Sequence, residues 1–281
     1  MAGILSGLSS LGLDDLENID IYAKPENENQ DVAGVQEVPK VDERELIYDK
    51  TFTCPVCDNK FSAKIMKTGK AKMLGTDADL RPRYEGIDAG KYDVEVCPKC
   101  GYAALSRFFP NVTAGQARLI REAISEKVHM HPYDGEIYTY EEAMERYTLA
   151  LVNAVVKRAR ASEKAYICLK SAWVVRGYQE ALEQENPEHV DVDALHQKEE
   201  EYLQNAYHGF LEAVQQESFP MCGMDEVTVD YLIAELAFHF KKYDVAGKLV
   251  ASILTSPSAN ARTKDKARDL KDQILEALKR K

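Results

Sequence analysis

The chain has 281 residues, of which 45% are hydrophobic and 30% are charged, so it can form one large or two modest domains with a real core. Its net charge of −11 is unevenly distributed, since residues 14–45 hold eleven acidic and three basic residues and so contribute −8. This balance argues against attraction of the whole protein to nucleic acid. No apolar run reaches the length of a membrane span, so we expect no membrane insertion.

The first 47 residues are expected to form a flexible acidic segment. Residues 1–13 are mildly apolar but lack the basic region and cleavage site of a signal peptide, and we interpret them as a docking segment or frayed end. Residues 24–45 are polar and contain proline, as is typical of a linker. With the cysteine usage described below, this indicates a cytoplasmic protein.

Residues 48–110 are predicted to form a small β module. Short β-type runs at 48–53 and 92–96 each lead into a pair of cysteines. A returning strand or hairpin with a bend at Gly69 is expected over 61–74, and an irregular excursion over 76–90, where Arg81-Pro82 interrupts regular structure.

The two cysteine pairs have identical spacing. They are Cys54-Pro-Val-Cys57 and Cys97-Pro-Lys-Cys100, and two facing C-P-x-C turns provide the tetrahedral set of four sulfurs that zinc prefers. A fully occupied site of this kind leaves no position for water, so the predicted role is structural. Iron of the rubredoxin type is the alternative, because the same geometry admits both metals. Asp58, which stands where rubredoxins have glycine, counts against iron.

Residues 111–281 are predicted to be helical, so the fold class is α+β and mostly α. Capping boxes begin helices at Thr113 and Thr139, and further helices are expected near 163–185, 193–217, 227–240, 243–254 and 261–279. The helix over 227–240 is apolar nearly all round, which predicts burial on several sides, His239 included. Residues 230–257 match a tetratricopeptide unit, and residues 140–150 resemble the second helix of another. Irregular helical hairpins are the alternative.

Other polar clusters have a plain structural interpretation. The lysines of the ribbon suit phosphate binding or a solvated strand face, and the second is favoured; they are Lys60, Lys64, Lys67, Lys70 and Lys72. Asp77 and Asp79 could bind a hard cation, but turn networks of this composition are commoner. His129 and His131 do not share a helix face and are poor metal partners. Cys168 is interpreted as a core residue.

Several motifs together resemble one bacterial family. They are the two cysteine turns, the stretch T-D-A-D-L-R-P-R-Y between them, K-Y-D-V-E-V before the second turn and R-F-F-P after it. The chain resembles, over most of residues 48–255, a domain family of unknown function found chiefly in Firmicutes. The resemblance implies a zinc-ribbon-like module fused to tetratricopeptide-like helices, with metal ligands Cys54, Cys57, Cys97 and Cys100 and no assigned reaction.

We therefore expect a non-enzymatic, zinc-binding interaction protein whose helical groove binds a protein or peptide. The alternatives are a rubredoxin-like iron redox module and a nucleic-acid accessory protein that uses the basic strand.

Overall fold

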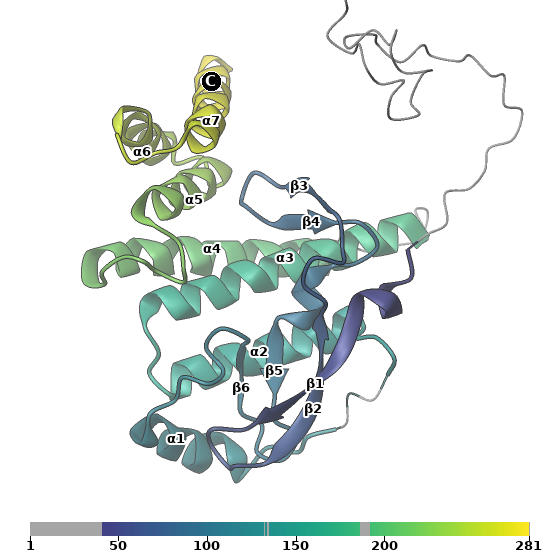
Figure 1. Cartoon of the computed structure of the whole chain (residues 1–281). Coiled ribbons are helices and arrows are strands. Elements are labelled where there is room, and N and C mark those ends of the chain that lie inside the picture. The colour runs from purple at the N-terminus through teal and green to yellow at the C-terminus, as the bar shows by residue number, and fades with distance from the viewer. Residues whose placement is uncertain (1–40, 132, 134, 186–191, 281) are drawn as a thin grey trace, which may run out of the picture. The chain divides into compact units, whose positions relative to one another are not determined.

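The computed structural model describes residues 41–131, 133, 135–185 and 192–280 (Figure 1). Residues 1–40, on which the predicted docking segment and most of the predicted linker fall, lie outside the described residues. The described chain contains three two-stranded antiparallel sheets followed by α-helices (Figure 1). The predicted α+β, mostly α class is confirmed.

Two hairpins carry the cysteine pairs at their turns. Strand β1 (Ile47–Thr53) pairs with β2 (Lys60–Met66) along its whole length, and β5 (Val94–Val96) pairs with β6 (Ala103–Leu105). The predicted strands before each cysteine pair are thus present. The first hairpin continues directly from a 3₁₀ turn over Glu43–Leu46, so folded structure starts a few residues before the expected position 48.

The chain between these hairpins is more regular than predicted. Strand β3 (Met73–Thr76) does not pair with β2 but forms its own hairpin with β4 (Pro82–Tyr84). Proline is tolerated at the start of this short strand because no third strand needs its missing N–H group. The expectation of an irregular excursion over 76–90 is therefore wrong for β4.

Seven α-helices follow among the described residues. Both predicted capping boxes are present, with Thr113 and Gln116 at the start of α1 and Thr139 and Glu142 at the start of α2. Asp225 and Asn260 cap α5 and α7, each by accepting a hydrogen bond from the backbone N–H three residues later. The helices are α1 (Ala114–Ile120, continuing as a π-helical turn over Arg121–Ser125), α2 (Tyr140–Val156), α3 (Ala161–Glu185), α4 (Asp193–Gln216), α5 (Glu226–His239), α6 (Tyr243–Thr255) and α7 (Ala261–Lys279).

The sheet of β5 and β6 has two differently occupied faces. Val94 and Leu105 lie in one core with Tyr147 and Ala150 of α2. Because side chains alternate along a strand, Glu95 and Ala104 lie on the opposite face. Ala104 belongs to the core that contains the cysteines. The sheet is thus enclosed between α2 and the cysteine module.

Helix α5 is buried around most of its circumference, as its sequence predicts, and shares one large core with α3, α4, α6 and α7. The expectation that His239 is buried is wrong. This residue ends α5, its side chain is exposed, and its Nε2 lies 2.6 Å from Oε1 of Glu200 on α4. At the end of a helix the burial pattern of the preceding turns no longer applies.

Charged residues hold the β3–β4 hairpin against the helices. Asp79 Oδ2 accepts hydrogen bonds from the Trp173 indole at 3.0 Å and from the Arg176 guanidinium at 2.8 Å. Arg81 pairs with Asp88 and Glu180, each at 3.1 Å. The favoured interpretation of the Asp77–Asp79 loop as a self-satisfied network agrees with these contacts, which reach α3.

We predict that Asp79→Ala lowers the free energy of unfolding by roughly 2–4 kcal/mol, because it leaves the buried Trp173 indole without its acceptor and removes one carboxylate from the half-buried Arg176. Urea unfolding followed by circular dichroism measures this. Asp265→Ala is the matched control, since Asp265 forms only an exposed ion pair with Arg268. Equal stability of the two variants would show that the Asp79 contacts do not hold the hairpin.

Candidate metal centre

The two cysteine turns have the same backbone design. The Cys54 N–H donates to the Asn59 carbonyl at 2.9 Å, and the Cys97 N–H donates to the Tyr102 carbonyl at 2.8 Å. In each turn the residue after the second cysteine has a positive φ, +57° at Asp58 and +69° at Gly101. Aspartate tolerates this conformation, so the departure from glycine at position 58 does not change the turn.

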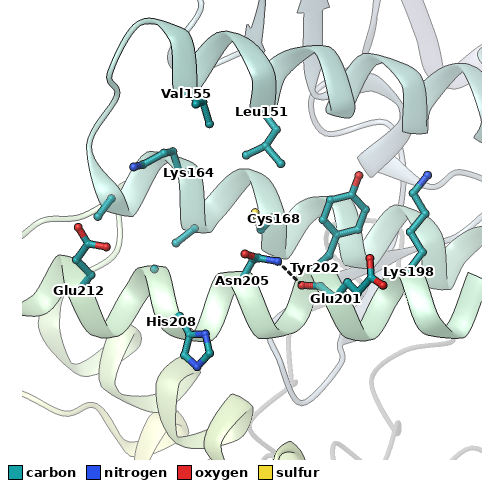
Figure 2. A pocket seen from close by; sticks show the side chains of 13 residues that line it. Leu151, Val155, Lys164, Cys168, Lys198, Glu201, Tyr202, Asn205, His208 and Glu212 are labelled. Atoms are coloured by element: carbon teal, nitrogen blue, oxygen red, sulfur yellow. Dashed lines mark hydrogen bonds between the residues drawn. The ribbon is translucent and has the colours of Figure 1, made fainter.

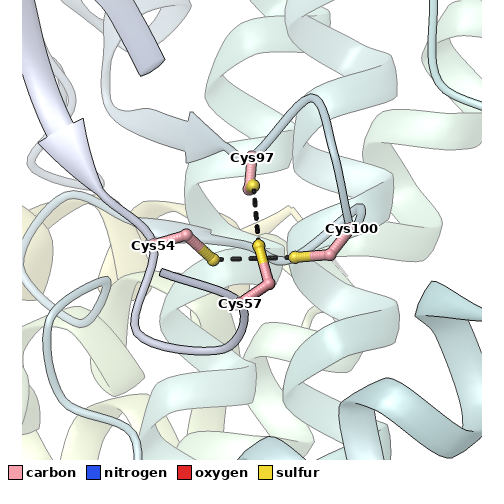
Figure 3. Close-up of side chains that lie close together, drawn as sticks. All are labelled: Cys54, Cys57, Cys97 and Cys100. Carbon is pink, nitrogen blue, oxygen red and sulfur yellow. Dashed lines mark hydrogen bonds between the residues drawn. The ribbon is translucent and has the colours of Figure 1, made fainter. Parts of the chain in front are cut away.

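The turns face each other and bring all four sulfurs together (Figure 3). The Sγ atoms of Cys54 and Cys100 are 3.6 Å apart, and those of Cys57 and Cys97 are 3.7 Å apart. All four lie within 4.8 Å of one another. A tetrahedral site with metal–sulfur bonds of about 2.3 Å requires sulfur separations of about 3.8 Å. The four cysteines therefore fit a metal ion.

The cluster cannot carry four negative charges by itself. Cys54, Cys97 and Cys100 are buried, and Cys57 is half-buried. Hydrogen bonds from the thiols of Cys100 and Cys54 lower the pKa of Cys97. The contact between Cys100 and Cys54, in contrast, raises the pKa of Cys100. A bound cation would replace these shared protons, so metal binding would release protons.

Each turn is also held by a side chain from a helical segment. Arg121 Nη1 donates to the Val56 carbonyl at 2.7 Å, and Asn153 Nδ2 of α2 donates to the Gly101 carbonyl at 3.0 Å. Gly101 approaches the neighbouring chain so closely that a Cβ there would lie 2.7 Å from Val128 Cγ1. The turns are thus fixed by the helices as well as by each other.

The two supporting residues differ in how readily the sequence predicts their roles. Asn153 interrupts the otherwise apolar stretch 149–156, which is a signal in the sequence that its side chain has a polar partner. No sequence pattern around Arg121 distinguishes it from an ordinary arginine on the surface of a helix. Its role depends on the approach of α1 to the first cysteine turn, which is a tertiary contact.

The other predicted candidates are not assembled with the cysteines. In the described part of the chain, the four cysteines form the single group of three or more potential metal ligands. His131 Nε2 lies 3.3 Å from Glu145, and His129 is exposed. Cys168 is buried as predicted, and burial raises the pKa of its thiol to about 11.

Three of the five lysines of the basic run already have partners within the chain. Lys64 pairs with Asp49 at 3.2 Å, Lys67 donates to the Glu45 carbonyl at 2.8 Å, and Lys72 lies 3.9 Å from Glu85. This arrangement suits the favoured interpretation, a solvated strand face.

Fold and site together define an α+β protein, mostly α, in which four clustered cysteines could hold a metal ion. The model of a family described as an uncharacterized protein conserved in bacteria (DUF2225) matches residues 47–274. This is most of the chain, so the chain belongs to that family, in agreement with the predicted resemblance. Searches of curated proteins and of solved structures gave no match. None of the helices described is both long and apolar enough to span a membrane.

We predict that Asn153→Leu speeds the transfer of zinc from the loaded protein to a chelator by about 10- to 100-fold, because the Gly101 carbonyl loses its donor. A colorimetric chelator assay measures the rate. Asn205→Leu on α4 is the control, since Asn205 is exposed and bonds only to a carbonyl of its own helix. Equal release rates would mean that Asn153 does not support the turn.

Proposed function

We propose that this protein is a non-enzymatic interaction module in which one structural zinc ion, held by Cys54, Cys57, Cys97 and Cys100, orders a zinc-ribbon-like unit beside a groove for a helical peptide. The observation that carries the proposal is the groove itself, which lies between α2 and α4 above α3 (Figure 2). The cysteine geometry supports the first half of the proposal and the groove supports the second.

A structural role for the metal is favoured by the surroundings of the sulfurs. Four thiolates complete a tetrahedral shell, so no position is left for a reacting molecule. The two turns belong to different hairpins, and the aromatic rings of Phe61, Tyr102 and Phe109 pack in the same core. A metal here would join two hairpins that are each too small to be stable alone.

The groove has an apolar wall and a floor of small residues. Leu151 and Val155 project from α2, and Val155 is 59% exposed despite its apolar side chain. Ala165 and Gly209 bring α3 and α4 into close contact, since a Cβ on Gly209 would lie 2.8 Å from that of Ala165. The cavity has a volume of about 490 Å³, enough for a few side chains of a partner.

The rim of the groove indicates what kind of segment would fit. Lys164 and Lys198 are balanced by Glu201 and Glu212, so the groove has no net charge to select a basic or acidic partner. An amphipathic helix from another protein would fit this groove. Two or three apolar side chains on one face would pack against the apolar wall, and polar side chains beside them would face the charged rim.

The helical part supports this arrangement through its close packing. Ala234 and Ala237 of α5 and Ala246 of α6 are fully buried, as small residues are at the crossing of tetratricopeptide-type helix pairs. Such arrays of helical hairpins expose extended grooves.

For the metal, we predict one zinc ion per chain by elemental analysis of the purified native protein, and a colourless solution. Cys97→Ser should lose the metal and lower the melting temperature, because three ligands cannot close the tetrahedral shell. Cys168→Ala, which removes a buried thiol outside the cluster, should keep it. Iron at one per chain with visible absorption would overturn the assignment of zinc.

For the groove, we predict that selection from a library of random 16-residue peptides enriches amphipathic helical sequences. Val155→Asp should weaken their binding at least about tenfold in calorimetric titration, because it places a charge in the apolar wall. Val155 is exposed, so the variant should fold normally. Leu275→Asp, at an apolar position on α7 that is 46% exposed, is the control. Failure to enrich peptides, or equal loss in both variants, would contradict the proposal.

A further inference from the structure

A second cavity lies on the other side of the β5–β6 sheet from α2. It is bounded by the β1–β2 hairpin and by α3, has a volume of about 400 Å³, and has the buried Glu95 and its neighbour Ser106 among its lining residues. Aromatic side chains of Phe52, Tyr92 and Trp173 contribute to its walls. This volume is within the range of small-molecule sites.

Most charges that line this cavity neutralise one another. Lys170 Nζ lies 2.6 Å from Asp93, and Arg81 Nη2 lies 3.1 Å from Asp88. After these pairs are removed, one acid and one base are left, Glu95 and Lys50. Neither of them forms an ion pair with another residue of the described chain.

Glu95 is the more unusual of the two. It is fully buried, and Oε1 accepts a hydrogen bond from the Ser106 hydroxyl at 2.6 Å, but Oε2 has no hydrogen-bond partner among the described residues. A buried acceptor without a donor is costly and is rare in folded proteins. The alternation along β5 directs this side chain away from α2 and toward the cavity.

Lys50 also lines this cavity, at a solvent-exposed position. It is exposed on β1, and its ammonium lies 5.1 Å from the centre of the Phe52 ring, whose side chain also lines the cavity. The cavity thus has an unpaired acceptor at its floor and an unpaired cation at its rim.

We propose that this cavity binds a small zwitterionic molecule, with a protonated amine or guanidinium donating to Oε2 of Glu95 and an acidic group facing Lys50. The nitrogen donates the hydrogen bond that the buried oxygen lacks, and charge-assisted bonds of this kind are the stronger class. The aromatic walls suit a cation, because ring faces attract positive charge. The site shares no residue with the four cysteines or with the α2–α4 groove.

The test uses the full-length, zinc-loaded protein and the twenty standard amino acids as probes. Thermal shift at millimolar concentration finds those that bind, and calorimetric titration gives their affinity. Each hit is compared with its decarboxylated amine, for example L-arginine with agmatine. We expect the amino acid to bind more tightly than the amine, because only the amino acid carries the group that Lys50 recognises.

The variants separate the two ends of the ligand. Glu95→Gln should weaken both the amino acid and its amine at least about tenfold, because the charge that receives the cation is lost. Lys50→Ala should weaken the amino acid alone, and Lys60→Ala, on the same hairpin but outside the cavity, should change neither. Zinc content and circular dichroism confirm that Glu95→Gln is folded, and Lys50→Ala provides a test even if it is not. Absence of binding by every probe, or binding that neither Glu95→Gln nor Lys50→Ala changes, would overturn the proposal.

Discussion

The neutralisation of buried sulfur charge is the constraint on which the β part of this protein depends. Four cysteines converge within 4.8 Å, and the contacts among them lower the pKa of Cys97 and raise the pKa of Cys100. Two-stranded hairpins have too little core to be stable separately. A cation at this point would join them, and the core around the cysteines continues through Phe61 and Tyr102 into Ile120 of α1. The β module and the first helix therefore share one core.

Helix α3 organises the rest of the chain. Ala165 and Cys168 lie at the floor of the α2–α4 groove, while Lys170 and Trp173 line the cavity on the sheet side. A single helix can do both because it is buried along much of its length and has no continuous solvent face. The Asp79 and Arg81 contacts then tie the β3–β4 hairpin to the same helix. Two separate concave surfaces are thus built on one rigid element.

Local signals in the sequence predicted what local physics controls. The C-P-x-C spacing predicted both turns and their convergence, and Thr113 and Thr139 marked two helix starts, because capping involves residues only three positions apart. The β3–β4 hairpin was missed because its position is set by Trp173 and Arg176, more than ninety residues away. Glu95 was not noticed for the same reason. Within a short strand Glu95 looks like any half-exposed acid. Its burial without a partner for Oε2 depends on the β1–β2 hairpin, the β5–β6 hairpin and α3, which meet only in the folded chain.

Helix α2 gives the metal centre and the groove a common support. Asn153 of this helix holds the second cysteine turn, while Leu151 and Val155, two residues before and after it, form the wall of the groove. Thermodynamic linkage is reciprocal, so a partner that prefers the groove of the zinc-loaded form must tighten zinc by the same factor by which zinc tightens the partner. If the cysteines bind zinc and the groove binds a partner as proposed, this one helix would make the occupancy of the groove depend on the concentration of free zinc.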